Sequence, residues 1–202
     1  MTLLANHPQR AEIHERLRRN IVLRRLSTQA FGELEALLAI VDYKKGDVLL
    51  SQGAHEMEQY FVIDGILKRV VASPEGKEMI LRFAKEDDMD TSYAAWKLRT
   101  PAPYSIRAVT KAQVAKMPLP QWAQFLDRHV DLKDDFEYEV MHLMSEVMAH
   151  TITLHLLDAP GRVHRFVRKH SDLAERVPKK ELASYLNLSA ETLSRLKQSG
   201  KI

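Results

Sequence analysis

The spacing of apolar residues along the chain changes period twice. Residues 8–41 carry apolar side chains at helical spacing, residues 43–117 carry short runs that alternate with a period of two, and helical spacing returns after Pro118. Glycines separate the short runs, at turns where the backbone needs a positive φ. Many short strands in one block, with the helices outside it, predict an α+β chain whose strands form a sandwich or barrel-like roll. The expected strands are residues 47–50, 59–64, 66–72, 78–83, 104–109 and 112–117.

The composition is that of a folded protein outside the membrane. Hydrophobic residues make up 45% of the 202 residues and charged residues 28%, which excludes a disordered chain and allows a real core. No apolar run approaches the roughly 18 residues of a membrane span, and the N-terminus MTLLANHPQR lacks the apolar core of a secretory signal. The absence of cysteine excludes disulfides, thiolate metal sites and cysteine-held iron–sulfur clusters. We therefore expect a soluble, cytoplasmic protein with no membrane partner.

One long helix is predicted over residues 133–157. A set of its side chains recurs at alternating steps of four and three, the pattern of a coiled-coil seam about three heptads long. These side chains are Phe136, Val140, Leu143, Val147, His150, Leu154 and Leu157, with His150 as a polar residue that sets the register. A second stripe, Met141, Met144 and Met148, runs beside them. Both stripes could pack on the roll in a monomer, but their apolar surface exceeds what one contact needs, which favours a homodimer. Pro160 and Gly161 are expected to end the helix and mark a domain boundary.

The last stretch, PKKELASYLNLSAETLSRLKQSGKI, has the pattern of two short helices joined by a tight turn. Ala183 is small enough for the second helix to cross close over the first, and Asn187 tolerates the left-handed backbone of the turn. Ser189 is a natural N-cap for the second helix. The pattern predicts a DNA-binding helix-turn-helix, with a basic helical hairpin that reads no DNA as the alternative. Its small core is Leu182, Leu186, Leu188, Leu193 and Leu196.

The charge of this stretch fits either a polyanion partner or a solvated surface rich in Lys and Arg. From Gly161 to the end, ten Lys and Arg residues stand against four Asp and Glu residues, a net charge of +6, although the whole chain carries only +3. Arg can make two hydrogen bonds to guanine, Glu can accept from cytosine, and Ser can bond a base or a phosphate. Glu191 and Arg195 could also form only a surface ion pair. The candidate DNA-binding residues are Lys179, Lys180, Ser189, Glu191, Thr192, Ser194, Arg195 and Lys197.

These segments together resemble the Crp/Fnr superfamily of bacterial transcription regulators. The resemblance rests on the stretches KKGDVLLSQG, FVIDGILKRV and PEGKEMILRF, on the long helix, and on ETLSR, which is similar to the Glu-x-x-Ser-Arg signature of the Fnr-like branch. It implies a cyclic-nucleotide-binding-like sensor domain at 1–132, built as a jelly-roll-like double-stranded β-helix. It further implies a dimerisation helix at 133–158 and a DNA-binding helix-turn-helix at 159–202.

The function that the resemblance implies is a dimeric transcription regulator. It would read a palindromic site in double-stranded DNA with the helix at 189–198, with RNA polymerase and a small-molecule effector as further partners. Arg195 would read guanine, Glu191 cytosine, and Ser194 a neighbouring thymine. Ala190 stands where the cyclic-AMP-binding branch has an arginine, which implies a half-site nearer TTGA than TGTGA.

Two parts of the chain depart from this family. The stretch KEDDMDTSYAAWKLRTPAPYSIRAV has no Gly-Glu step, and Pro-Ala-Pro-Tyr at 101–104 stands where an Arg-Ser pair would cradle a cyclic phosphate. An anionic ligand would lack its donors there, so cyclic AMP is not expected to be the effector, whose identity stays unknown. The sequence reaches SGKI where a β-hairpin wing would begin, which leaves a short wingless form and a truncated sequence both open.

The sequence gives little support for a metal site, a haem site or a catalytic site. The pairs His150 with His155 and His164 with His170 lack the three- or four-residue spacing of a helical metal site, so no metal site is predicted. Haem held by a lone histidine is kept as a minor alternative, and the cofactor is otherwise unknown. The acidic run EDDMD at 86–90 is interpreted as a solvated turn. No catalytic motif is present, so an enzyme is not expected. The competing class is a ligand-binding or protein-interaction module whose tail has lost DNA binding.

Overall fold

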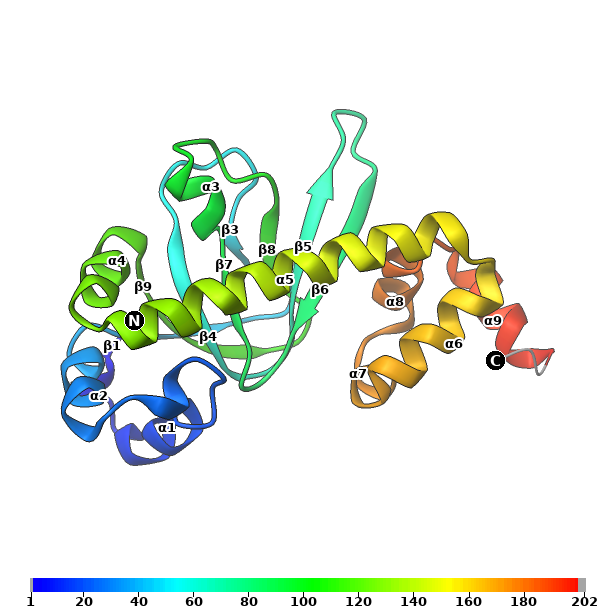
Figure 1. The fold of residues 1–202 in the computed structure, drawn as a ribbon. Helices are drawn as coiled ribbons and strands as arrows, with labels where there is room; N and C mark the ends of the chain where they lie inside the picture. The colour runs from blue at the N-terminus through cyan, green and yellow to red at the C-terminus, as the bar shows by residue number, and fades with distance from the viewer. Residues whose placement is uncertain (1, 200–202) are drawn as a thin grey trace.

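Short helices at the N-terminus pack beside the strands (Figure 1). The computed structural model describes residues 2–199. β1 (Thr2–Leu3) and the 3-10 turn η1 (Leu4–Asn6) precede α1 (Arg10–Leu17), the 3-10 turn η2 (Leu23–Arg25) and α2 (Thr28–Glu35). Ser27 caps α2, because its hydroxyl accepts a hydrogen bond from the backbone N–H of Ala30 at 3.1 Å.

The strands form two antiparallel sheets that together make the roll. One sheet has the order β1-β2-β9-β4-β7 and the other the order β3-β8-β5-β6. Between β4 and β5, Gly65 has φ +89°, and a Cβ added there would lie 2.3 Å from the carbonyl oxygen of Lys111, so only glycine fits this turn. All six expected strands are present. The strands are β2 (Ala39–Tyr43), β3 (Val48–Leu50), β4 (Glu58–Asp64), β5 (Leu67–Ala72), β6 (Glu78–Ala84), β7 (Met89–Thr91), β8 (Ser105–Ala108) and β9 (Ala112–Pro118).

Two strands, β2 and β7, form where the sequence predicted a helix and a solvated turn. β2 occupies the end of the segment predicted to be helical, because it pairs along its whole length with β9, with Val41 opposite Val114. β7 occupies the end of the acidic run predicted to be a solvated turn, pairs with β4, and carries a fully buried Asp90. In both places hydrogen bonds to a distant strand override the local pattern.

The long helix lies across the front of the roll (Figure 1). α3 (Tyr93–Lys97) follows β7, and α4 (Leu119–Arg128) and α5 (Val130–Leu156) follow β9. Trp122 of α4 packs edge to face against Phe61 of β4 at 5.4 Å and against Phe136 of α5 at 5.3 Å. These aromatic contacts hold the first half of α5 against the roll.

The C-terminal helices lie at the far end of α5 (Figure 1). They are α6 (Ala159–Lys169), α7 (Ser171–Arg176), α8 (Lys179–Tyr185) and α9 (Ala190–Gln198). The long helix ends at Leu156, whereas Pro160 and Gly161 lie in the first turn of α6, where a proline needs no backbone donor. Asp158 caps α6 by accepting from the backbone N–H of Gly161 at 3.0 Å. Within residues 2–199, no helix is long and apolar enough to cross a membrane.

Candidate nucleic-acid interface

The frame of the candidate site is the pair α8 and α9 with the turn between them. Asn187 in this turn has φ +52°, the left-handed conformation expected of it. Leu182, Ala183 and Leu193 are buried between the two helices and the neighbouring α6 and α7. The turn and the small core therefore hold α9 at a defined angle to α8, as a recognition helix requires.

Two of the predicted DNA-binding residues stabilise the start of α9. The hydroxyl of Ser189 accepts a hydrogen bond from the backbone N–H of Thr192 at 3.1 Å, and the two hydroxyls lie 3.1 Å apart. Ser189 is thus the N-cap of α9, and Thr192 completes the cap. Both side chains have a structural task in addition to any contact with DNA.

The exposed face of α9 carries Glu191, Ser194, Arg195 and Lys197. No ion pair joins Glu191 to Arg195 within residues 2–199, so the surface pair considered from the sequence is absent from this part of the chain. Hydrogen bonds from its own backbone N–H and from Ser189 hold the pKa of Glu191 below its ordinary value. The face therefore presents a guanidinium, an ionised carboxylate and a hydroxyl, the groups that can read base edges.

The flanking lysines lie at the first turn of α8. Lys179 and Lys180 are exposed there, and Lys197 is exposed near the end of α9. All the predicted DNA-binding residues thus belong to one helical unit. Exposed ammonium groups at the start of α8 and near the end of α9 are groups that can contact DNA phosphates.

The predicted dimer seam on α5 is turned toward the interior of the chain. Phe136 and Leu143 are buried in the core of the roll, with Val140 packed against it, and His150 is stacked on Tyr185 of α8 with ring centroids 3.8 Å apart. Val147 and Leu154 are half-buried, and only Leu157 is exposed. For Phe136, Leu143 and His150 the prediction is therefore wrong, because these side chains hold α5 to the roll and to the C-terminal helices. For Val147, Leu154 and Leu157, which are not buried, it stays a prediction.

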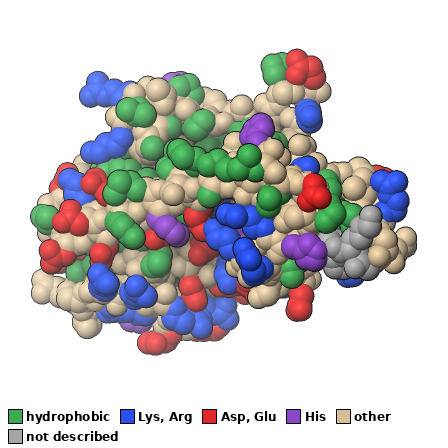
Figure 2. Space-filling view, turned by 45° about the vertical axis from the view of Figure 1, so that its right-hand side comes forward, with side chains coloured by type: hydrophobic (Ala, Val, Ile, Leu, Met, Phe, Trp, Pro, Cys, Tyr) green, Lys and Arg blue, Asp and Glu red, His purple; other side chains and the backbone are tan. Residues whose placement is uncertain are grey.

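The opposite face of α5 carries the exposed apolar stripe. Met141 and Met148 are 62% and 66% exposed, and Figure 2 shows hydrophobic side chains running in a row across this face of the molecule. The error in the seam has a simple cause. A heptad spacing shows that side chains share one face of a helix, but it does not show whether the same chain or a second chain covers that face. The stripe, called here the outer stripe, consists of Tyr138, Met141, Met144, Met148, Ile152 and Leu156.

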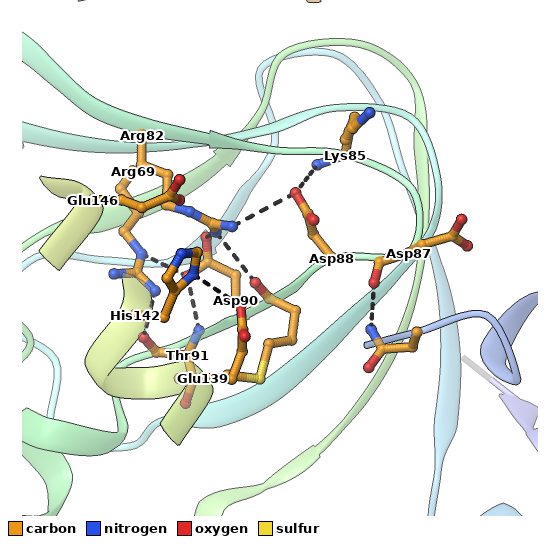
Figure 3. A network of polar contacts seen from close by, with 12 residues as sticks. Arg69, Arg82, Lys85, Asp87, Asp88, Asp90, Thr91, Glu139, His142 and Glu146 are labelled. Carbon is orange, nitrogen blue, oxygen red and sulfur yellow. Dashed lines mark hydrogen bonds and ion pairs between the residues drawn. The ribbon is translucent and has the colours of Figure 1, made fainter. Parts of the chain in front are cut away.

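The inside of the roll holds a buried ionic cluster beneath α5 (Figure 3). Asp90 is fully buried, and its carboxylate accepts from Nε of Arg69 at 2.7 Å and from Nη1 of Arg82 at 3.4 Å. The guanidinium of Arg69 also lies over the ring of Tyr104, whose hydroxyl donates to the carbonyl of Thr91 at 2.6 Å. Asp90 belongs to the run predicted to be solvated, but it is buried and pairs with both Arg69 and Arg82 inside the roll. The sequence signal that was missed is the step Met89–Asp90–Thr91, a short strand with an acid at its centre.

The histidines do not gather into a metal site in the part of the chain that the structure describes. No group of three His, Asp or Glu side chains there could hold a metal ion. His150 is instead part of an aromatic cluster with Tyr185 and Phe166, whose rings lie 5.3 Å apart.

Sequence comparisons show that the chain is similar to bacterial regulators. Residues 40–129 match the model of the cyclic nucleotide-binding domain family. The chain is similar to the cAMP-activated global transcriptional regulator CRP of Salmonella typhimurium, with 20% identity over 76% of this chain and 78% of CRP. It is also similar to the nitrogen fixation regulation protein FixK of Bradyrhizobium diazoefficiens, with 24% identity over 89% of this chain and 78% of FixK. Both relatives are regulators rather than enzymes.

Solved structures show the same fold. CLP, the c-di-GMP responsive global regulator of Xanthomonas campestris, superposes with a TM-score of 0.71 at 16% identity, covering 86% of this chain and 92% of CLP. FixK2 of Bradyrhizobium japonicum superposes with a TM-score of 0.68 at 16% identity, covering 81% and 86%. The predicted α+β fold with its jelly-roll-like sensor is confirmed. Residues 40–129 match the cyclic nucleotide-binding domain, and the proteins and structures to which the chain is similar include the regulators CRP, FixK and CLP of the Crp/Fnr type.

Proposed function

We propose that the chain is a sequence-specific, DNA-binding transcription regulator of the Crp/Fnr type. The observation that carries the proposal is the outward face of α9, where Glu191, Ser194 and Arg195 are exposed side by side on a capped helix. Arg195 reads guanine, Glu191 accepts from cytosine, and Ser194 contacts a neighbouring thymine. Lys179, Lys180 and Lys197 bind phosphates, which set the register of the helix on the duplex.

The active form is a homodimer joined along the outer stripe of α5. A solvent-exposed row of large apolar side chains along a helix of 27 residues is well suited to pair with the same row of a second copy. Two copies of α9 then bind a palindrome whose half-sites lie about one helical turn, roughly 34 Å, apart. The protein works in the cytoplasm, with RNA polymerase as a further partner.

Replacing the predicted reader of guanine tests this function. Selection of DNA from a randomised library should yield a palindrome for the unmodified protein. Arg195→Ala should cost about 1–3 kcal/mol in binding and relax the preference at one position of each half-site, because a bidentate contact is lost.

Lys197→Ala is the matched control, since it removes a cation from the same helix. It should weaken all sequences alike and reduce the slope of log affinity against log salt by about one. Equal affinity and an unchanged sequence preference in Arg195→Ala would show that α9 does not read DNA, and would favour the interaction-module alternative.

We propose further that cyclic AMP is not the effector. Arg69 and Arg82 are the buried cations inside the roll, and both are bound to Asp90. A cyclic phosphate entering there would meet a buried carboxylate and no uncommitted pair of donors. Calorimetry with cyclic AMP should therefore show no saturable binding, and a dissociation constant in the low micromolar range would contradict the proposal.

A further inference from the structure

A cavity lies at the joint between the roll, the long helix and the C-terminal helices. It has a volume of about 60 Å³ and is walled by β6, α5, α6 and α8. The side chains that matter here are Arg82 from β6, Glu146 and His150 from α5, Arg165 and Lys169 from α6, and Tyr185 from α8. This cavity is separate from the Asp90 cluster, although Arg82 borders both.

Two buried nitrogen atoms that border this cavity have no hydrogen-bond partner. They are Nε of Arg82 and Nε2 of His150, and each of these two residues is only 8–9% exposed. The terminal nitrogens of Arg82 contact the carbonyl of Met89 and the carboxylates of Asp88 and Asp90. Only Nε of this guanidinium therefore lacks a hydrogen-bond partner within residues 2–199. A native protein seldom leaves two buried polar atoms of one cavity unpaired, which points to a bound group that pairs them.

The charges around the cavity are predominantly positive. Glu146, the acid among its walls, is paired with Lys169 at 2.8 Å. Arg162 also lines the cavity, but its guanidinium is used by the carbonyls of Leu157 and Leu186. Arg165 is exposed at the rim and has no partner within residues 2–199. The ligand that fits is therefore an anion small enough for this space.

The His150 ring specifies which anion. Burial lowers the pKa of His150 to about 4, opposed by a hydrogen bond with the backbone of Tyr185, so the ring is neutral at pH 7. A neutral imidazole has one N–H and one lone pair, so Nε2 can pair with a ligand group that donates or with one that accepts, according to the tautomer. A ligand that carries both a donor and acceptors therefore suits Nε2 in either tautomer, while the ligand atoms facing Arg82 and Arg165 must accept.

We infer that this cavity binds a phosphate group, as the free ion or as a phosphomonoester. Inorganic phosphate at neutral pH, and a phosphomonoester in its monoprotonated form, each carry a P–OH donor for Nε2 of His150 and P–O oxygens that accept from Arg82 and Arg165. Sulfate at neutral pH has acceptors only and fits less well. Because the walls come from the roll, from α5 and from the DNA-binding helices, bound phosphate stabilises their present arrangement by mass action.

Isothermal titration calorimetry of the full chain in a phosphate-free buffer tests the site. Potassium phosphate should bind saturably with one ion per chain, and potassium sulfate at equal ionic strength should bind at least about tenfold more weakly. Arg165→Gln should weaken phosphate binding by about tenfold or more, whereas Arg168→Gln, on the same helix but outside the cavity, should leave it within about twofold. His150→Phe, which keeps a ring against Tyr185 but removes Nε2, should abolish the preference for phosphate over sulfate. Melting curves confirm that each variant is folded.

Glycerol 3-phosphate separates the two sources of the group. If it competes with phosphate, the cavity takes phosphomonoesters; if phosphate alone binds, the ligand is the free ion. Absence of saturable phosphate binding, equal affinity for sulfate, or equal loss in the two arginine variants would overturn the inference. The experiment contains no DNA, so its failure would leave the proposal for α9 untouched.

Discussion

At the scale of single residues, Glu35 shows how one buried charge joins two helices. It is 2% exposed at the end of α2 and accepts hydrogen bonds from Nη2 of Arg10 and from Nδ1 of His14, both at 2.6 Å. Burial alone would raise the pKa of Glu35, but the hydrogen bonds from His14 and Arg10 hold it below its ordinary value. Glu35 therefore stays ionised and holds α1 on α2.

Glu35→Gln should lower the free energy of unfolding by about 1–3 kcal/mol at pH 7, because charge-assisted hydrogen bonds are lost. The pKa of Glu35 is lower in the folded chain than in the unfolded one. Its contribution is thus present above the unfolded value of about 4.3 and is lost as pH falls through the folded value. Denaturant unfolding at several pH values should show the variant and the unmodified protein converging in acid.

Glu15→Gln is the control for this change. Glu15 is exposed on α1, and the same substitution there should alter the free energy of unfolding by no more than about 0.5 kcal/mol. A constant difference between Glu35→Gln and the unmodified protein from pH 7 to pH 3 would contradict the role given to the carboxylate.

At the scale of elements, α5 has two apolar faces with different partners. Its inner face, with Phe136 and Leu143, is buried in the chain, and its outer stripe is exposed. We therefore expect Met144→Glu with Met148→Glu to give a folded monomer, because charges in the outer stripe would repel a second copy. Sedimentation velocity at micromolar concentration and a melting curve would measure the two properties separately.

Two substitutions elsewhere make this test specific. Met79→Glu changes an exposed methionine on β6 in the same way and should leave the dimer intact. Leu143→Glu should unfold the chain, since it places a charge in the core. A dimer that survives the double change in the outer stripe would rule out this face as the contact.

At the scale of the whole molecule, the C-terminal helices are attached to the roll by charge as well as by apolar packing. Lys68 of β5 bonds Glu181 of α8 at 2.7 Å, and Glu86 bonds Arg176 of α7 at 2.6 Å. Phe83 of β6 packs against Tyr185 with ring centroids 5.2 Å apart. The position of α9 relative to the roll therefore depends on contacts between segments about 100 residues apart.

Glu181→Lys should weaken this attachment by about 1–3 kcal/mol, because the nearly buried Lys68 would face a like charge. Limited proteolysis near Leu157 and Asp158, between α5 and α6, should then be faster. The double variant Lys68→Glu with Glu181→Lys should restore the original rate. Glu175→Lys is the control, because it adds the same charge at an exposed position on α7 and should change the rate of proteolysis little. If Glu181→Lys and Glu175→Lys were cleaved at the same rate, the ion pair would be excluded as the cause.

Local features of the sequence determined much of the fold and the form of the candidate site. The alternating runs and glycine turns predicted six strands, because pleated strands and positive φ are requirements of the backbone itself. Asn187 and Ser189 predicted the turn between α8 and α9 and the cap of α9 for the same reason. The predictions for the roles of Glu191 and Arg195 and for the limits of the domains stay predictions.

Only the tertiary structure decided which surfaces meet. The heptad spacing of α5 does not show what covers that face of the helix, and the packing of Phe136 against Trp122 shows that its first half turns inward. Asp90 belongs to an acidic run typical of a solvated turn, yet pairing with β4 and the nearby Arg69 keep it buried. The phosphate cavity is formed by β6, α5, α6 and α8 together. Burial and charge pairing depend on neighbours distant in the sequence, whereas turns, caps and strand periods depend on neighbours along the chain.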